Sequence, residues 1–83
     1  MPELKVGTVS DFFARPVVAG VELTGELNTG DLIHIKGHTT DIEFTVTSMQ
    51  IDNKTITSAK AGDIIGIKVA ERVRPGDIVY KVI

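Results

Sequence analysis

The share of β-branched residues constrains the fold of this chain more than any other feature of its sequence. Ten Val, ten Ile and nine Thr make 29 of the 83 residues β-branched, while the chain has only four Leu and five Ala. β-Branched side chains fit the pleated surface of a sheet, whereas Leu and Ala favour helices. The sequence therefore predicts an all-β protein without an amphipathic helix.

Length, charge and cysteine content exclude several classes of protein. A chain of 83 residues leaves no room for a second domain, so residues 1–83 are expected to form one domain. The formal charge of −2 argues against a protein that coats nucleic acid through bulk positive charge. Because the chain has no Cys, disulfides, thiolate chemistry and Cys-based metal sites are excluded.

The N-terminal sequence bears on localisation. Met-Pro-Glu-Leu-Lys has no basic segment followed by an apolar stretch, so it does not resemble a secretory signal. The chain also lacks the run of about 18 apolar residues that a membrane-spanning helix needs. We therefore expect a soluble, cytoplasmic protein.

Apolar segments separated by Gly, Pro and Asp turns predict six main strands and one short strand. The main strands are predicted at residues 4–12, 17–23, 32–36, 42–51, 64–69 and 78–82, and the short strand at 55–57. Such short, evenly spaced strands are typical of a small barrel or a sandwich. A barrel is preferred because closure removes exposed strand edges. The predicted fold is a small closed six-stranded antiparallel β-barrel.

Breaks in the alternation predict irregularities within these strands. Gly7 indicates a bulge or a close approach of another backbone segment, and Thr47–Ser48 is expected to form a bulge that brings Met49 back to the inner face. In the last strand, the predicted inward side chains are those of Ile78, Tyr80 and Val82.

Three segments repeat a Gly-Asp pair followed by apolar residues. They begin at Gly30-Asp31, Gly62-Asp63 and Gly76-Asp77. In a turn, Gly adopts a positive φ at no steric cost, and the Asp carboxylate accepts hydrogen bonds from nearby backbone N–H groups. We interpret the repeat as three similar turns, and not as a metal or acid–base cluster of the three Asp residues.

Six motifs occur along the chain: Gly7-Thr8-Val9, Gly20-Val21-Glu22-Leu23, the segments 27–35 and 59–67, Val46-Thr47-Ser48-Met49 and Pro75-Gly76-Asp77. As a set they resemble the second domain of translational GTPases such as elongation factor Tu. The resemblance spans nearly the whole chain, and residues 33–41 are similar to small stand-alone elongation-factor-like proteins. It implies a barrel of the elongation-factor domain 2 type that contacts tRNA or ribosomal RNA. A phosphate-binding Gly-x-x-x-x-Gly-Lys-Ser/Thr loop is missing, so we expect no nucleotide. A related barrel in collagenase-like peptidases is a second resemblance.

The histidines and serines do not form a recognisable catalytic or metal-binding motif. His34 is expected on a solvent-facing side of its strand, about 13 Å from His38 if the chain is extended, which is too far for both to bind one metal ion. We expect His38 to form a loop hydrogen bond or to contact a partner. None of the three Ser has an evident His–Asp partner, and a small filled barrel leaves little space for a substrate. The chain is therefore expected to be neither an enzyme nor a cofactor-binding protein.

Basic residues occur at the ends of the predicted strands and loops. Lys36 precedes the loop that contains His38, Arg72 and Arg74 precede the last turn, and Arg15 follows the first strand. Loop placement suits contacts with phosphate groups. The alternative is that these residues are ordinary solubilising charges balanced by acidic neighbours.

Two adjacent aromatic residues are the candidates for an apolar docking site. Phe12 and Phe13 must point to opposite sides of a strand, so one of them is expected to be exposed. An exposed ring could stack on a base or dock a protein, whereas packing of both rings in the core is the alternative.

Two functional hypotheses follow. The first is a non-catalytic translation-type module that binds ribosomal RNA, tRNA or a translation factor through Lys36, His38, Arg72 and Arg74. The second is a protein-interaction or accessory module, for instance of a collagenase-like peptidase, that docks through Phe12 or Phe13. The resemblance to translational GTPases makes the first the main hypothesis, whereas the acidic balance of the chain slightly favours the second.

Overall fold

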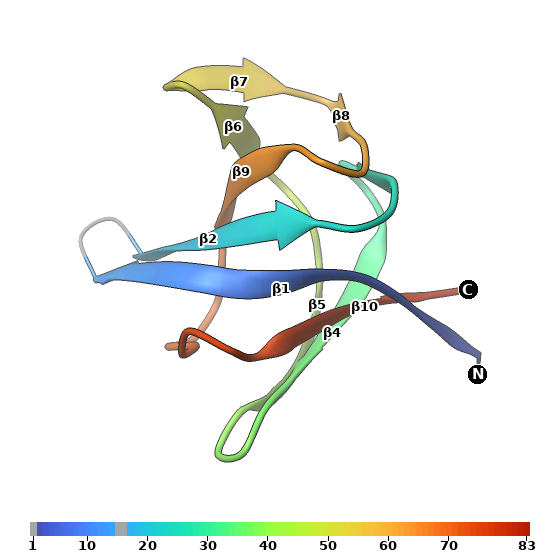
Figure 1. Ribbon diagram of the computed structural model, residues 1–83, viewed down its shortest axis with the longest axis vertical. Helices are drawn as coiled ribbons and strands as arrows, with labels where there is room; N and C mark the ends of the chain where they lie inside the picture. The colour runs from blue at the N-terminus through green and yellow to red at the C-terminus, as the bar shows by residue number, and fades with distance from the viewer. Residues whose placement is uncertain (1, 15–16) are drawn as a thin grey trace.

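The computed structural model is built from β-strands alone over the residues that it describes, 2–14 and 17–83 (Figure 1). The strands are β1 (Glu3–Ala14), β2 (Val17–Leu23), β3 (Leu27–Asn28), β4 (Leu32–Lys36), β5 (Asp41–Thr45), β6 (Met49–Ile51), β7 (Lys54–Ile56), β8 (Ser58–Ala59), β9 (Ile64–Lys68) and β10 (Ile78–Val82). The all-β prediction is confirmed. Within the same ranges, no helix of the length and apolarity needed to cross a membrane is found.

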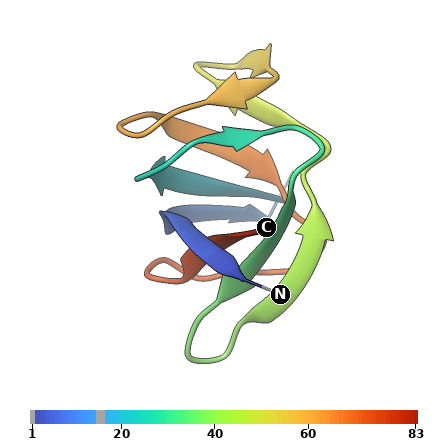
Figure 2. The ribbon, with the colours of Figure 1, turned by 90° about the vertical axis from the view of Figure 1, so that its right-hand side faces the viewer.

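Eight of these strands form one antiparallel sheet. Its order is β5-β4-β10-β1-β2-β9-β6-β7, and β3 pairs with β8 in a second, two-stranded sheet. The large sheet is strongly curved (Figure 2). Its hydrogen-bond ladder does not close, because within the described chain β5 and β7 each have a neighbour on one side only. The prediction of a closed six-stranded barrel is therefore wrong.

Isolated backbone hydrogen bonds connect the segments between the two ends of the large sheet. The Gly30 N–H donates to the Val46 carbonyl at 2.8 Å, and the Val46 N–H donates to the Asp31 carbonyl at 2.9 Å. The Thr29 N–H donates to the Thr57 carbonyl at 3.0 Å. These bonds, together with the β3–β8 pair, stand where a closed barrel would have a continuous ladder.

The predicted long strand at 42–51 is divided into β5 and β6. β5 pairs with β4 at one end of the large sheet, whereas β6 pairs with β9 and β7 at the other end. Residues 46–48 cross between the two ends. Val46 within this segment and Met49 directly after it are both buried. The sequence predicted a bulge at Thr47–Ser48 to turn Met49 inward, and in the structure this crossing has that effect.

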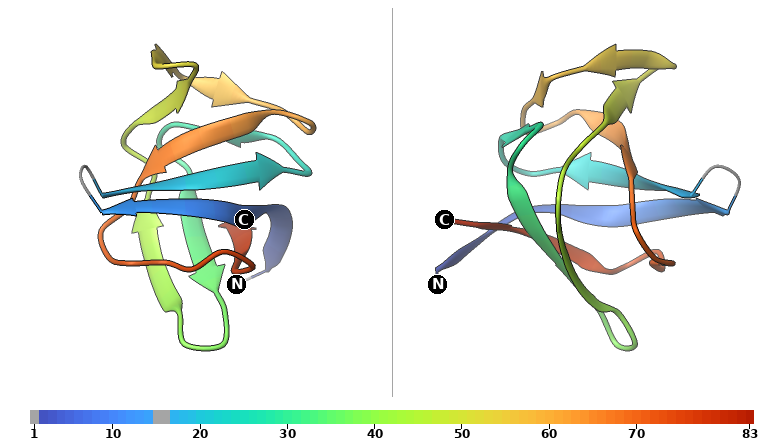
Figure 3. Two further views of the ribbon diagram at one scale, coloured as in Figure 1. Left: turned by 60° about the vertical axis from the view of Figure 1, so that its left-hand side comes forward. Right: turned by 180° about the vertical axis from the view of Figure 1, so that it is seen from behind.

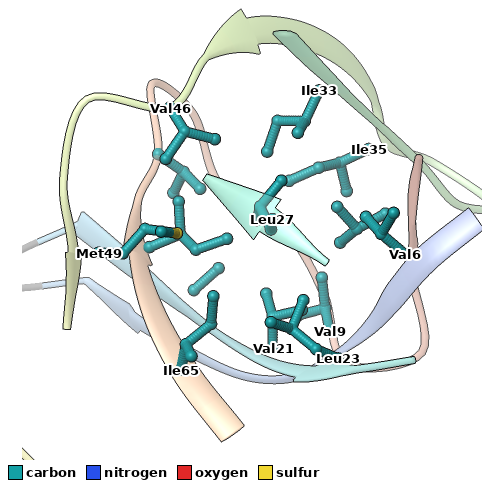
Figure 4. Close-up of a cluster of buried hydrophobic side chains, with 14 of the residues drawn as sticks. Val6, Val9, Val21, Leu23, Leu27, Ile33, Ile35, Val46, Met49 and Ile65 are labelled. Carbon is teal, nitrogen blue, oxygen red and sulfur yellow. The ribbon is translucent and has the colours of Figure 1, made fainter. Parts of the chain in front are cut away.

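The core lies on the concave side of the curved sheet, where buried side chains from many strands meet (Figure 4). Ile33, Ile35, Ile65 and Ile67 are at most 2% exposed, as their alternation predicts. In β10, however, Val79 is fully buried, and the prediction of Ile78, Tyr80 and Val82 as the inward set is wrong. The reason is register: Val79 lies opposite Ile35 on β4, so the two share the inner face.

Gly7 lies where the backbone of β1 is irregular. The pairing of β1 with β10 shifts register between Lys5 and Gly7. A Cβ atom on Gly7 would lie 2.9 Å from the Glu22 carbonyl oxygen, so the neighbouring backbone approaches closely. The predicted bulge and close approach are confirmed.

The three Gly-Asp segments form the same turn. Gly30, Gly62 and Gly76 have φ values of 92°, 94° and 96°. The carboxylates of Asp31, Asp63 and Asp77 each accept a hydrogen bond from the backbone N–H three residues earlier, at 2.8, 3.0 and 2.9 Å. Each carboxylate therefore serves its own turn, which confirms the interpretation as turn chemistry.

Candidate functional site

A groove crosses the outer face of β1, β2, β9 and β6 (Figure 3, left, shows β1, β2 and β9 side by side). Asp11, Gly20, Gly66 and Gln50 are paired in one row across these four strands. The two central residues of the row are glycines, so the floor of the groove is backbone without side chains. The groove has a volume of about 620 Å³.

Large apolar side chains border this groove. Phe13 is 54% exposed and Ile64 is 65% exposed, and the half-buried Val18 also lines the groove. Water contact with apolar surface is unfavourable, so a partner that covered Phe13 and Ile64 would gain free energy from their burial.

Acidic side chains stand at the two ends of the groove. Asp11 lies on β1 and Asp52 follows β6, and both line the groove. Ion pairs involving either carboxylate are absent from residues 2–14 and 17–83. Beside its apolar side chains, the groove is therefore lined by the polar Ser10, Gln50 and Asn53 and carries a carboxylate toward each end.

The two phenylalanines predicted as docking residues point to different environments. Phe13 belongs to the outer groove, whereas Phe12 is partly buried against the core. The guanidinium carbon of Arg72 lies 6.0 Å from the centre of the Phe12 ring, which is within cation–π range. The structure thus separates Phe12 and Arg72 from the groove that contains Phe13.

The other predicted contact residues lie near one end of the sheet. Lys36 ends β4, and the exposed His38 follows it in the hairpin to β5. Gly37 of this hairpin packs against Asp77, whose carboxylate accepts the Arg74 N–H, so the hairpin and the last turn adjoin. Arg15 lies outside the described residues.

His34 forms an ionic cluster that the sequence did not predict. Its Nδ1–H donates to Glu3 Oε2 at 2.6 Å, and its Nε2–H donates to Asp41 Oδ1. Glu43 lies opposite His34 on β5 and can offer a carboxylate oxygen within 4.8 Å of ligand atoms of Glu3 and His34. Both ring nitrogens of His34 are already occupied by carboxylates, so a cation would have to displace a proton, and we assign no metal to this cluster.

The His34 cluster makes the stability of the protein depend on pH. Hydrogen bonds to Asp41 and Glu3 raise the pKa of His34 above 6.5, because they favour the imidazolium form. The stabilisation is therefore fully present below pH 6.5 and is lost as the pH rises through the folded-state pKa. The same bond lowers the pKa of Asp41 below 3.8, so that carboxylate's contribution is lost only as the pH falls below this value.

We expect the melting temperature of the wild type to fall more steeply above pH 6.5 than that of His34→Gln. Thermal unfolding followed by circular dichroism between pH 5 and 9 measures this difference. His38→Gln is the matched control, because His38 is exposed. Identical pH profiles for the wild type and His34→Gln would contradict the assignment.

The groove itself was also missed in the sequence. Gly20 and Ile64 fall in two separate predicted strands, 17–23 and 64–69, and nothing in the sequence places these strands side by side. The signal is the opposition of Gly20 and Gly66, which becomes visible only when the pairing of β2 with β9 is known.

Comparisons with known proteins relate the chain to proteases. No protein-family model matches it. The chain is 42% identical over 79 residues to an uncharacterized protease of Methanocaldococcus jannaschii, which covers 94% of the chain and 19% of that protein. It is 37% identical over 81 residues to a collagenase of Porphyromonas gingivalis, which covers 95% of the chain and 20% of that protein. The chain thus spans about a fifth of the length of the curated relatives it matches.

A solved structure shows the same fold. It is the C-terminal domain of a Geobacillus thermoleovorans protein described as a U32 peptidase, with a TM-score of 0.88 and 16% identity. The match covers 95% of this chain and 92% of that domain. The selenomethionine variant of the domain matches with a TM-score of 0.85.

These findings correct the resemblance to translation factors. The homologous proteins are a protease and collagenases, and the matching structures are C-terminal domains of a U32 peptidase. The assignment as a stand-alone translation elongation factor-like protein is wrong. The expected role in translation and RNA binding rested on this assignment and is wrong as well. Over nearly its whole length, the chain is similar to one segment of much larger proteases and to a peptidase C-terminal domain.

Proposed function

We propose that the chain is a non-catalytic accessory module of a peptidase and that it binds protein through the outer groove. The observation that carries the proposal is the extent of the sequence match. Nearly all of this chain aligns with about a fifth of each protease relative, which is the relation expected of an accessory domain within a larger enzyme.

The groove supports a binding role because it exposes apolar side chains. Phe13 and Ile64 together present an aromatic and an aliphatic group on one face. Exposed apolar patches of this kind mark interaction surfaces in folded proteins. Large aromatic residues also contribute strongly to binding energy when a partner covers them.

The chemistry of the groove supports the absence of catalysis. Ser10 is the serine that lines it, and its hydroxyl donates to the Gly20 carbonyl at 3.3 Å. A serine nucleophile needs a general base within hydrogen-bond distance. His34 is held by Glu3 and Asp41, and the groove lining contains no His among the described residues.

A binding experiment tests this function directly. The chain is mixed with the Methanocaldococcus jannaschii protease from which the homologous segment has been deleted, and complex formation is measured by gel filtration and calorimetry. We expect a 1:1 complex for the wild type and at least tenfold weaker binding for Phe13→Ser combined with Ile64→Ser. No peptide hydrolysis is expected from the chain alone.

The control is Leu4→Ser, because Leu4 is as exposed as Phe13, at 54%, but does not line the groove. This variant should bind like the wild type. Absence of a complex with the truncated protease, or proteolysis by the isolated chain, would refute the proposed function.

A further inference from the structure

We propose that the groove binds an extended polypeptide segment in which two Lys or Arg residues, four positions apart, flank a central apolar residue. This inference rests on the proposed function, because it assumes that the occupant of the groove is protein. It adds the chemistry of the segment, which follows from the width, length and charge of the groove.

The width of the groove favours an extended chain over a helix. On β2, the side chains of Val18 and Glu22 flank Gly20, and on β9 those of Ile64 and Lys68 flank Gly66. Each flanking pair is four residues apart, which is about 13 Å between Cα atoms. The flanking side chains occupy part of this width, so a helix with a diameter of about 10–12 Å does not fit, whereas a single extended strand does.

The length of the groove sets the spacing of the charges. Asp11 and Asp52 lie at opposite ends, on β1 and directly after β6. These strands are separated by three inter-strand steps, or about 14 Å across the sheet, and Asp52 lies two residues beyond Gln50, the β6 residue in the row of Asp11. An extended segment covers about 13 Å in four residues, and its side chains at positions i, i+2 and i+4 point to the same face. The long, flexible side chains of Lys or Arg at i and i+4 can cover the remaining offset along the strands and reach the two carboxylates.

The centre of the groove suits an apolar side chain at position i+2. The adjacent Gly20 and Gly66 leave the floor open, and Phe13, Val18 and Ile64 surround it with apolar surface. A Leu, Ile or Phe side chain placed there would bury these groups and be buried by them. The backbone of the floor is already paired between strands, so a polar side chain there would find its partners only in the side chains of Ser10, Gln50 and Asn53 that line the groove.

The charges around the groove agree with a cationic segment. Asp11, Asp52 and Glu22 are negative, and Lys68 is the basic residue of the bordering positions. The charges of Glu22 and Lys68 cancel. The net charge around the groove therefore comes from the carboxylates of Asp11 and Asp52. Because ion pairs to these two are absent from the described residues, a bound Lys or Arg would not have to displace a partner seen there.

Fluorescence anisotropy with synthetic peptides tests the inference on the full chain. The probe is a fluorescein-labelled eleven-residue peptide of Ser and Thr with Arg at positions 4 and 8 and Leu at position 6. Three matched peptides carry Glu in place of both Arg, Ser in place of Leu, or the two Arg side by side. We expect saturable binding of the first peptide, at least fivefold weaker binding of each matched peptide, and weakening with salt.

Variants of the chain locate the binding site. Asp11→Asn and Asp52→Asn should each weaken binding about threefold, as expected for exposed ion pairs. Gly66→Val should abolish it by filling the floor. Gly66→Ala is a milder version, since a Cβ there would lie 3.3 Å from Val18 Cγ1, an atom of a side chain that can shift. Glu26→Gln, an exposed carboxylate outside the groove, should bind like the wild type.

The outcomes separate this inference from the proposed function. Equal affinity for all four peptides, or unchanged binding by the Asp11→Asn, Asp52→Asn and Gly66→Ala variants, would overturn it. Binding of the truncated protease without selective binding of the Arg–Leu–Arg peptide would leave the accessory function standing and refute the sequence preference. Selective peptide binding without a protease complex would support the groove chemistry and refute the accessory function.

Discussion

Replacing Leu27 with Ala is expected to lower the free energy of unfolding by about 3 kcal/mol, within the range for buried Leu-to-Ala substitutions. Leu27 is fully buried and lies among the labelled core side chains near the centre of Figure 4. It belongs to the short strand β3, which pairs with Ala59 of β8. Truncation would therefore leave a cavity in the middle of the core and loosen the small sheet beside the open ladder.

Such a loss is large for a domain of this size. At 0.05–0.15 kcal/mol per residue, an 83-residue domain has a total stability of about 4–12 kcal/mol. A loss of about 3 kcal/mol lowers the melting temperature by about 12 °C or more. Urea titration and thermal unfolding, both followed by circular dichroism, measure the two quantities.

Leu4→Ala is the matched control for this substitution. Leu4 is 54% exposed at the start of β1, so its truncation should change the free energy of unfolding by no more than about 0.5 kcal/mol. If Leu27→Ala were as stable as Leu4→Ala, the central position of Leu27 in the core would be refuted.

Gly37→Ala is expected to destabilise the fold by about 2–3 kcal/mol through overpacking. A Cβ atom on Gly37 would overlap Asp77 Oδ1 and lie 2.5 Å from Asp77 Cγ. Asp77 is only 5% exposed and cannot easily move, because its carboxylate accepts the Arg74 N–H and its carbonyl accepts the Val9 N–H. The clash would therefore strain the contact between the β4–β5 hairpin and the last turn.

A double-mutant cycle identifies the cause of this loss. Asp77→Ala removes the turn hydrogen bond and should itself be destabilising. In Gly37→Ala/Asp77→Ala the clash is absent. The loss in free energy of unfolding of the double variant should therefore be smaller than the sum of the two single losses by about 1 kcal/mol or more. Additive free energies of unfolding in denaturant titrations would argue against the clash. Gly66→Ala, which meets no atom closer than 3.3 Å, should lose much less.

The resemblance to elongation factors shows which motifs report fold and which report function. Most of the motifs that carry it are turns and core positions, such as Gly30-Asp31 and Gly62-Asp63. The structure shows that these pairs serve local hydrogen bonds. Residues that stabilise turns do not identify a partner, because function depends on the chemistry of surface sites and one fold hosts many of them. The similarity of the whole chain to proteases is therefore stronger evidence about function than these motifs.

Local features were predictable from the sequence because their causes are local. β-Branched content predicted the strand class, and the alternation of Ile33 with Ile35 and of Ile65 with Ile67 agrees with their burial. The Gly-Asp turns were also predictable, since positive φ and the carboxylate–backbone bond involve residues only a few positions apart. Strand β3 lies outside the predicted strands, because two residues carry no periodicity.

Tertiary structure decided what depends on which strands become neighbours. The crossing between β5 and β6 left the ladder open, and the register of β10 buried Val79 in place of Tyr80. Pairing of β2 with β9 brought Gly20 and Gly66 together to form the groove. Pairing of β4 with β5 set His34 beside Asp41 and Glu43, and β1 brought Glu3 to the same side chain. The sequence by itself determined an all-β chain with three repeated turns. The open sheet and its outer groove depend on contacts between residues far apart in the chain, which no local pattern encodes.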